Sequence, residues 1–156
     1  WEEIGRLTLA TAASSFTLSS IPARKYLQIY VNIVNTTATD SAIQFNGDTG
    51  NNYNYSINDG SGAFGGTNKN IFAVSTASGG DVFAKYGIVN YPSRPKIGIG
   101  MIASLDSNSA AASIYQRNVY GAWHNASQIN SIRVFGSYGG PANFGVGSEI
   151  IVLGHD

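Results

Sequence analysis

The chain has 156 residues, which is long enough for one domain with a sizeable core, and its composition excludes several classes of function. Basic and acidic residues balance at 9 each, so the formal net charge is zero and no basic cluster points to a nucleic-acid partner. There is no Cys, which excludes disulfides and thiolate metal sites. No apolar run approaches the roughly 20 residues that span a membrane, so we expect no membrane insertion.

Alternating apolar and polar residues predict β-strands along the whole chain. The clearest strand covers residues 25–34, where Leu27, Ile29, Val31 and Ile33 share one face and are expected to face the core. Residues 35–40 are expected to form a turn. Residues 60–70 are rich in Gly, Ser and Asn and are expected to form a long surface loop. Further strands are expected at 3–9, 16–18, 42–45, 53–58, 71–75, 82–89, 96–104, 113–120, 130–135 and 149–153.

No segment has helical spacing over three turns, so the pattern favours an all-β fold. We expect an antiparallel β-sandwich, with a jelly roll as the preferred topology and an immunoglobulin-like sandwich as the alternative. In strand 96–104, glycines alternate with larger residues and indicate a bend or the close approach of another backbone. No repeat or linker divides residues 1–156, so a single domain is expected. Because the chain begins at Trp1 and not at Met, we expect it to be a fragment of a longer protein.

The stretch from Ala42 to Asp59 reads AIQFNGDTGNNYNYSIND and predicts a β-hairpin with a polar tip, because Asn, Asp and Gly accommodate tight turns. A strand followed by FNGDTG and an N-Y-x-Y run resembles a pattern found in structural proteins of tailed bacteriophages. The end of the chain resembles the closing strands of the same modules. It contains NSIRV at 130–134, Asn143-Phe144, and GSEIIVLG at 147–154, where Leu153-Gly154 stands without the expected Tyr.

The resemblance implies a non-enzymatic virion component, which is a tail or head fibre, a spike tip or a capsid decoration module. Such a component is assembled in the cytoplasm of the bacterial host and is exposed on the particle, where it mediates host attachment. The resemblance also implies a homotrimer, contacts with other virion proteins and a host cell-surface glycan as a further partner. Low charge and the outward rings of Tyr26 and Tyr30 are compatible with a subunit contact. The alternative is a carbohydrate-binding module of a secreted enzyme, which would also be a neutral β-sandwich rich in Tyr and Asn.

Catalytic and metal-binding patterns are weak. His124 and His155 are the two histidines, and neither belongs to a nucleophile motif. Asp48 and Asp59 flank the expected hairpin and could form a glycosidase pair, but both are also ordinary turn residues. Oxygen atoms of the Asn46–Asp59 loop could hold calcium, although their spacing departs from the known calcium loop. We therefore expect no catalytic residue, no cofactor and no metal.

Aromatic residues beside turns are the candidates for ligand contact, because rings stack on sugar faces while carboxylates bind hydroxyl groups. For a glycan site we expect first Asp48, Tyr53 and Tyr55 near the hairpin tip, and then Tyr120 and Trp123. The alternative, which we favour, is that these rings cap the ends of the sandwich or fill a subunit interface.

Overall fold

The computed structural model describes residues 1–34, 40–72, 74–75, 80–138 and 144–156, which contain twelve β-strands and no helix. None of these residues therefore forms a helix that could cross a membrane. The turn expected at 35–40 lies mostly outside the described residues and stays a prediction. The strands are β1 Glu2–Thr8, β2 Ser15–Leu18, β3 Tyr26–Ile33, β4 Asp40–Phe45, β5 Tyr53–Asn58, β6 Ala63–Lys69, β7 Val74–Ser75, β8 Val82–Val89, β9 Lys96–Leu105, β10 Ile114–Trp123, β11 Ile132–Tyr138 and β12 Glu149–His155.

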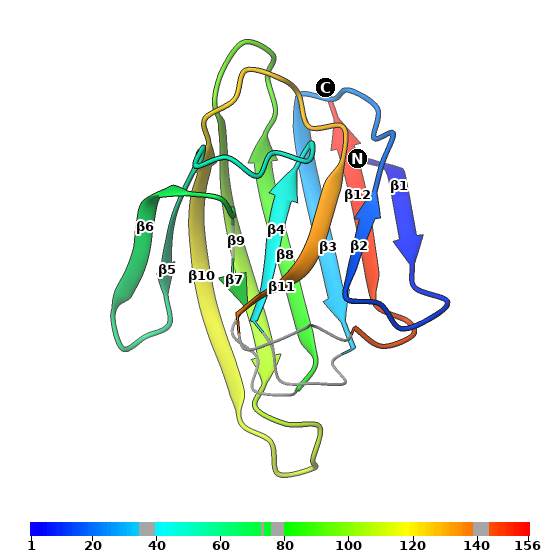
Figure 1. The fold of residues 1–156 in the computed structure, drawn as a ribbon, viewed down its shortest axis with the longest axis vertical. Coiled ribbons are helices and arrows are strands. Elements are labelled where there is room, and N and C mark those ends of the chain that lie inside the picture. Colours follow the sequence, from blue (N-terminus) through cyan, green and yellow to red (C-terminus); the bar gives the residue numbers. More distant parts are fainter. Residues whose placement is uncertain (35–39, 73, 76–79, 139–143) are drawn as a thin grey trace.

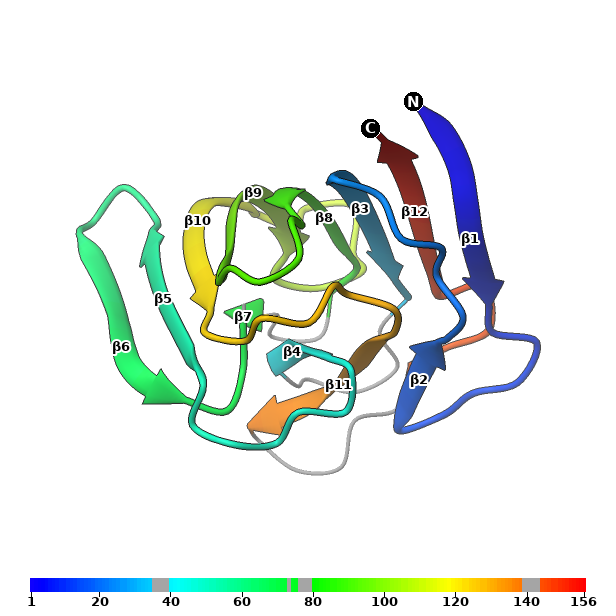
Figure 2. The ribbon, with the colours of Figure 1, turned by 90° about the horizontal axis from the view of Figure 1, so that it is seen from above.

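The strands form two antiparallel sheets, which confirms the expected β-sandwich (Figure 1). The large sheet has the order β1-β12-β3-β8-β9-β10-β5-β6, and the small sheet has the order β2-β11-β4-β7. Figure 2 shows β4, β7 and β11 on one side of the centre of the large sheet, while no other strand of the described residues covers the opposite side of β8, β9 and β10. The jelly-roll topology stays a prediction.

The core lies between the two sheets, and β3 contributes the side chains that its alternation predicts. Leu27, Ile29, Val31 and Ile33 are at most 2% exposed, so their expected orientation is confirmed. The neighbouring β12 adds Ile150 and Val152 to the same layer. Burial of one face fixes the register of these strands, because a slip of one residue would point every apolar side chain of the strand toward solvent.

The expected hairpin between 42 and 59 is wrong, because its two strands belong to different sheets. β4 pairs with β11 and β7, whereas β5 pairs with β10 and β6. The two strands are linked by a side chain and not by a ladder of backbone hydrogen bonds: the Tyr53 hydroxyl accepts a hydrogen bond from the Phe45 N–H at 3.0 Å. Asn46 and Gly47 do form the expected turn, but this turn carries the chain from one sheet to the other.

The surface loop expected at 60–70 is also wrong, because residues 63–69 form β6 and pair with β5. β6 is the edge strand of the large sheet and is exposed on nearly its whole length, so it lacks the apolar alternation that would have revealed it. Gly65 has a structural role here. A Cβ atom at this position would lie 2.1 Å from the carbonyl oxygen of Tyr55, which explains why a glycine stands at this point of the pairing.

Candidate functional site

The carboxylate of Asp48 lies at the centre of the turn between β4 and β5 and accepts hydrogen bonds from several groups. The Trp123 indole N–H donates to Oδ2 at 2.7 Å, Asn52 Nδ2 donates to the same oxygen at 3.0 Å, and the Gly50 N–H donates to Oδ1 at 2.9 Å. Partial burial alone would raise the pKa of Asp48, but these hydrogen bonds outweigh it and hold the pKa below its ordinary value. The carboxylate is therefore engaged in fixing the turn.

The rings of Tyr53 and Trp123 lie in the core and not on the surface. Their planes are 18° apart, their centroids are 6.2 Å apart, and both side chains are 0% exposed. The polar ends of both rings are satisfied inside the protein, by Phe45 for the hydroxyl of Tyr53 and by Asp48 for the indole N–H of Trp123. Asp48, Tyr53 and Trp123 thus form one structural cluster, whose rings offer no face to a ligand in this conformation.

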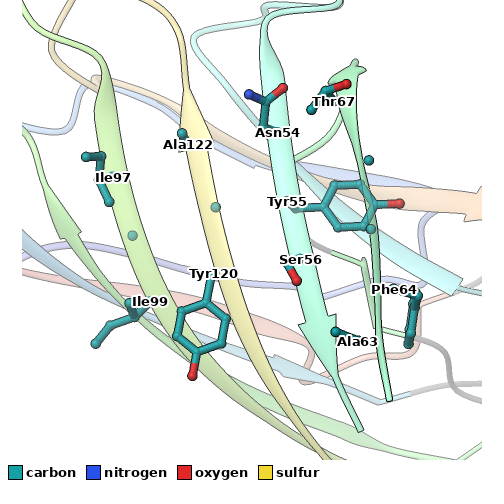
Figure 3. A pocket seen from close by; sticks show the side chains of 14 residues that line it. Asn54, Tyr55, Ser56, Ala63, Phe64, Thr67, Ile97, Ile99, Tyr120 and Ala122 are labelled. Atoms are coloured by element: carbon teal, nitrogen blue, oxygen red, sulfur yellow. The ribbon is translucent and has the colours of Figure 1, made fainter. Parts of the chain in front are cut away.

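Tyr55 and Tyr120 lie on opposite faces of the large sheet. Tyr55 pairs with Gly121 and is partly buried on the core side, whereas Tyr120 is the next residue on β10 and faces outward. In Figure 3 the ring of Tyr55 extends across β6, while that of Tyr120 points toward β9. Of the five residues expected to contact a glycan, Tyr120 alone exposes about half of its side chain, at 54%. The structure does not gather the five into one site.

The groups considered for catalysis or metal binding are also separated. Asp48 and Asp59 lie at opposite ends of β5, which at about 3.3 Å per residue places them on the order of 20 Å apart. The carboxylate of Asp59 accepts hydrogen bonds from the N–H and hydroxyl of Ser61. His124 Nε2 lies 2.8 Å from Asn54 Nδ2. In the part of the chain that the structure describes, no three His, Asp or Glu side chains are grouped as metal ligands would be.

Lys96 is a buried cation beside this region that the sequence did not reveal. Its side chain is 0% exposed, and Nζ donates to the carbonyl oxygens of Tyr91, Arg94, Asn125 and Ala126. Burial lowers the pKa of Lys96, since it disfavours the charged form. The bonds hold the loop before β9 against the loop after β10.

Strand β9 turns its glycines inward and its large apolar side chains outward. Gly98 and Gly100 face the core, where a Cβ atom would lie 2.8 Å from the Phe72 ring and 2.3 Å from the Tyr86 ring respectively. The backbone of β8 also lies close, because a Cβ atom at Gly100 would be 2.8 Å from the carbonyl oxygen of Lys85, so the expected approach of another backbone is present beside these rings. On the other face, Ile97 and Ile99 are each 62% exposed.

The neighbouring strands extend this outward surface, which we name the β8–β10 face. In these three strands, all of which the structure describes, Lys85 is the one charged residue that the pairing places on this face. Its ammonium lies 5.4 Å from the centre of the Tyr30 ring on β3. The large apolar side chains of the β8–β10 face are Phe83, Val89, Ile97, Ile99, Met101, Ile114 and Tyr120.

Two of the open hollows on this face lie on either side of Tyr120. The larger has a volume of about 590 Å³ and runs between β9–β10 and β5–β6, where Ile97, Ile99, Ser56 and Thr67 contribute to its lining (Figure 3). The smaller, of about 350 Å³, lies over Gly87 and is bordered by Met101. Both are shallow and mainly apolar, as is typical of contact surfaces rather than enclosed active sites.

No protein-family model, no curated protein and no solved structure matches the chain. Sequence reasoning found Tyr120 but missed Ile97, Ile99 and Met101 as surface residues. The available signal was the alternation of glycines with large residues along β9. A face made of glycines leaves space for side chains from elsewhere, so the glycine face could be the buried one and the large side chains could point outward.

Proposed function

We propose that this domain is a non-enzymatic component of a bacteriophage virion, assembled in the host cytoplasm and exposed on the particle as part of a fibre, a spike tip or a decoration module. The observation that carries the proposal is the position of the two segments that resemble phage modules. FNGDTG forms the turn fixed by Asp48 and Trp123, and residues 149–153 lie in β12, between β1 and β3 of the large sheet. Both segments therefore belong to the framework of a single fold.

The geometry of the surface also favours a contact function over catalysis. The carboxylates that the sequence offered as a catalytic pair are separated by the length of β5. Among the described residues, the β8–β10 face is an exposed surface that is apolar and nearly uncharged. Such a surface suits a protein that is assembled with other proteins, because exposed apolar patches of this kind mark interaction sites.

Mass spectrometry of purified particles tests this function. Particles released from the organism that encodes the chain are purified by density-gradient centrifugation, and peptides of the chain are quantified across the fractions. We expect these peptides to follow the particle fractions and to remain after a high-salt wash. Antibodies against the domain should label intact particles in electron micrographs, since the domain is proposed to be exposed.

The matched control is a lysate of the same organism without particle production, carried through the same gradient. Peptides that sediment identically in both gradients would contradict the proposal, as would peptides confined to the soluble fractions. Labelling of disrupted but not intact particles would place the domain inside the virion and would contradict its exposure.

A carbohydrate-binding role, on a host surface or in a secreted enzyme, is the second candidate, and the larger hollow is the observation that favours it. The exposed ring of Tyr120 lies beside it, and Ser56 and Thr67 bring hydroxyl groups to its lining. A glycan array would identify a ligand, and Tyr120→Ala should then weaken binding at least tenfold. Tyr115→Ala is the control, because Tyr115 is an exposed ring whose pairing with Ser104 places it on the opposite face of β10. Equal losses in both variants would exclude this hollow as the site.

A further inference from the structure

We propose that the β8–β10 face packs against other copies of this chain, with Ile97, Ile99 and Tyr120 near the centre of the contact. The proposal goes beyond the function above, because it names the partner of one particular face and holds whether or not the domain is carried on a particle. It rests on four features of this face. The core fixes the orientation of its strands, the face carries almost no charge, its apolar area is close to that of a protein interface, and its projections and hollows can fit those of another copy.

The outward orientation of the apolar side chains is fixed by the core. Turning β9 over would bury Ile97 and Ile99, but the space on the inner side is already filled by the rings of Phe72 and Tyr86. Val82, Ala84, Tyr86 and Ile88 hold the adjacent β8 in the same register. The exposed isoleucines are thus a feature of the native packing and not a consequence of slippage.

The low charge of the face suits a copy of the same chain as the partner. A strongly charged partner would find only Lys85 on these three strands, and that ammonium already lies against the ring of Tyr30. A second copy presents an equally neutral surface, so two such faces meet with little like-charge repulsion. The whole chain has zero formal net charge, which removes the long-range barrier to the same encounter.

The area of the face is close to what a specific interface needs. Its seven large apolar side chains are between 43% and 73% exposed. The rings of Phe83 and Tyr120 each offer on the order of 150–250 Å² when fully exposed, and with less for the aliphatic side chains the seven together present on the order of 600 Å². Standard protein interfaces bury roughly 800 Å² on each partner. Monomeric proteins rarely leave an apolar patch larger than roughly 300–600 Å² uncovered.

The projecting side chains and the hollows of this face can also fit those of a second copy. Tyr120 and Ile99 project between the two hollows, and a Cβ atom added to Gly87 would meet no atom within 4 Å, so the strand beside Ile99 has an empty position. Projecting side chains of one copy therefore have room to enter the hollows of another. A heterologous partner is not required to explain any part of this surface.

Light scattering and sedimentation velocity over a concentration series test the proposal on the 156-residue chain. We expect a mass of more than one chain for the wild type. Ile99→Glu and Ile97→Glu are two independent variants, and each should raise the concentration of half-dissociation at least tenfold. Neither side chain belongs to the core, so circular dichroism should show the β-structure retained in both. The matched control is Thr17→Glu, which adds the same charge at an exposed position of β2 in the small sheet.

A wild-type mass fixed at one chain up to roughly millimolar concentration would overturn the proposal. So would association that both isoleucine variants leave unchanged, or that Thr17→Glu weakens equally. Association of a folded Ile97→Glu variant at wild-type strength would overturn it even if Ile99→Glu failed to fold. Binding of a glycan that Tyr120→Ala abolishes, by a protein that stays monomeric, would assign the face to a ligand instead. The particle experiment is independent of these results, so the failure of one proposal is distinguishable from the failure of the other.

Discussion

Trp123 donates its indole N–H to Asp48 at 2.7 Å, across 75 residues of sequence, and this bond fastens the turn between the two sheets to the end of β10. Trp123 is fully buried, so its N–H has no access to bulk water. A buried donor without an acceptor is costly, because it loses its hydrogen bond to water without replacement. Asp48 is therefore a structural residue whose effect should be visible in unfolding experiments.

Asp48→Ala should lower the free energy of unfolding by about 1–3 kcal/mol, since it leaves the indole N–H without its acceptor. Asp48→Asn is the matched variant, because its amide oxygen can still accept that bond while the negative charge is lost. We expect a smaller loss for the amide. Urea denaturation followed by tryptophan fluorescence measures both, and equal losses would show that the charge, not the acceptor, is what matters.

Gly100 and Gly87 lie on adjacent strands and form a matched pair of glycine positions. Gly100→Ala should destabilise the protein by about 1–3 kcal/mol, because the added Cβ would lie 2.3 Å from the Tyr86 ring. Gly87→Ala meets no atom within 4 Å, and it should leave stability unchanged or raise it by about 0.4–1 kcal/mol through the unfolded state. Thermal and urea unfolding measure the difference. If the two variants were equally stable, the inward direction of Gly100 would be wrong.

Ile29 lies at the centre of β3 and is 0% exposed, so Ile29→Ala should cost about 2–5 kcal/mol in unfolding free energy. Asn32 is exposed on the opposite face of the same strand, and Asn32→Ala should change stability by less than about 0.5 kcal/mol. Urea unfolding of the two variants side by side provides the comparison. A loss below about 1 kcal/mol for Ile29→Ala would mean that the core repacks around the missing atoms.

Stability should fall in alkaline solution, because burial raises the pKa of Tyr86 well above its ordinary value of 10.0. Above about pH 10 the unfolded chain releases this proton while the folded chain retains it, so the unfolded state binds fewer protons and is stabilised relative to the folded state. The stabilising contribution is complete below about pH 10 and is lost as the pH rises toward the folded-state pKa. Tyr86→Phe should therefore show a shallower alkaline loss in urea midpoints. Tyr120→Phe, at an exposed position, should follow the wild type.

Strand positions with one buried face could be predicted from the sequence. The run from 25 to 34 alternates regularly, and the structure places its apolar residues in the core as expected. Partners of strands could not be predicted in the same way. Asn46, Gly47 and Asp48 have the chemistry of a tight turn, but that chemistry does not specify whether the chain returns to the same sheet or crosses to the other one.

The candidate site was harder to predict because ring position depends on tertiary contacts. Tyr53 and Trp123 look like surface rings when they are read beside polar turn residues, yet both are buried because Phe45 and Asp48 satisfy their polar atoms. Ile97 and Ile99 look like core residues when they are read alone. They face outward because rings from elsewhere in the chain occupy the space beneath Gly98 and Gly100.

A proximity measurement at the β8–β10 face tests most directly whether this face contacts another copy of the chain. The chain has no Cys, so Ile99→Cys introduces a single reactive thiol, and a short bis-maleimide can then join only thiols of different copies. We expect covalent dimers for Ile99→Cys and none for Thr17→Cys, which places the thiol at an exposed position of the small sheet. Equal yields at the two positions, or no dimer at position 99, would contradict the claim that this face contacts another copy.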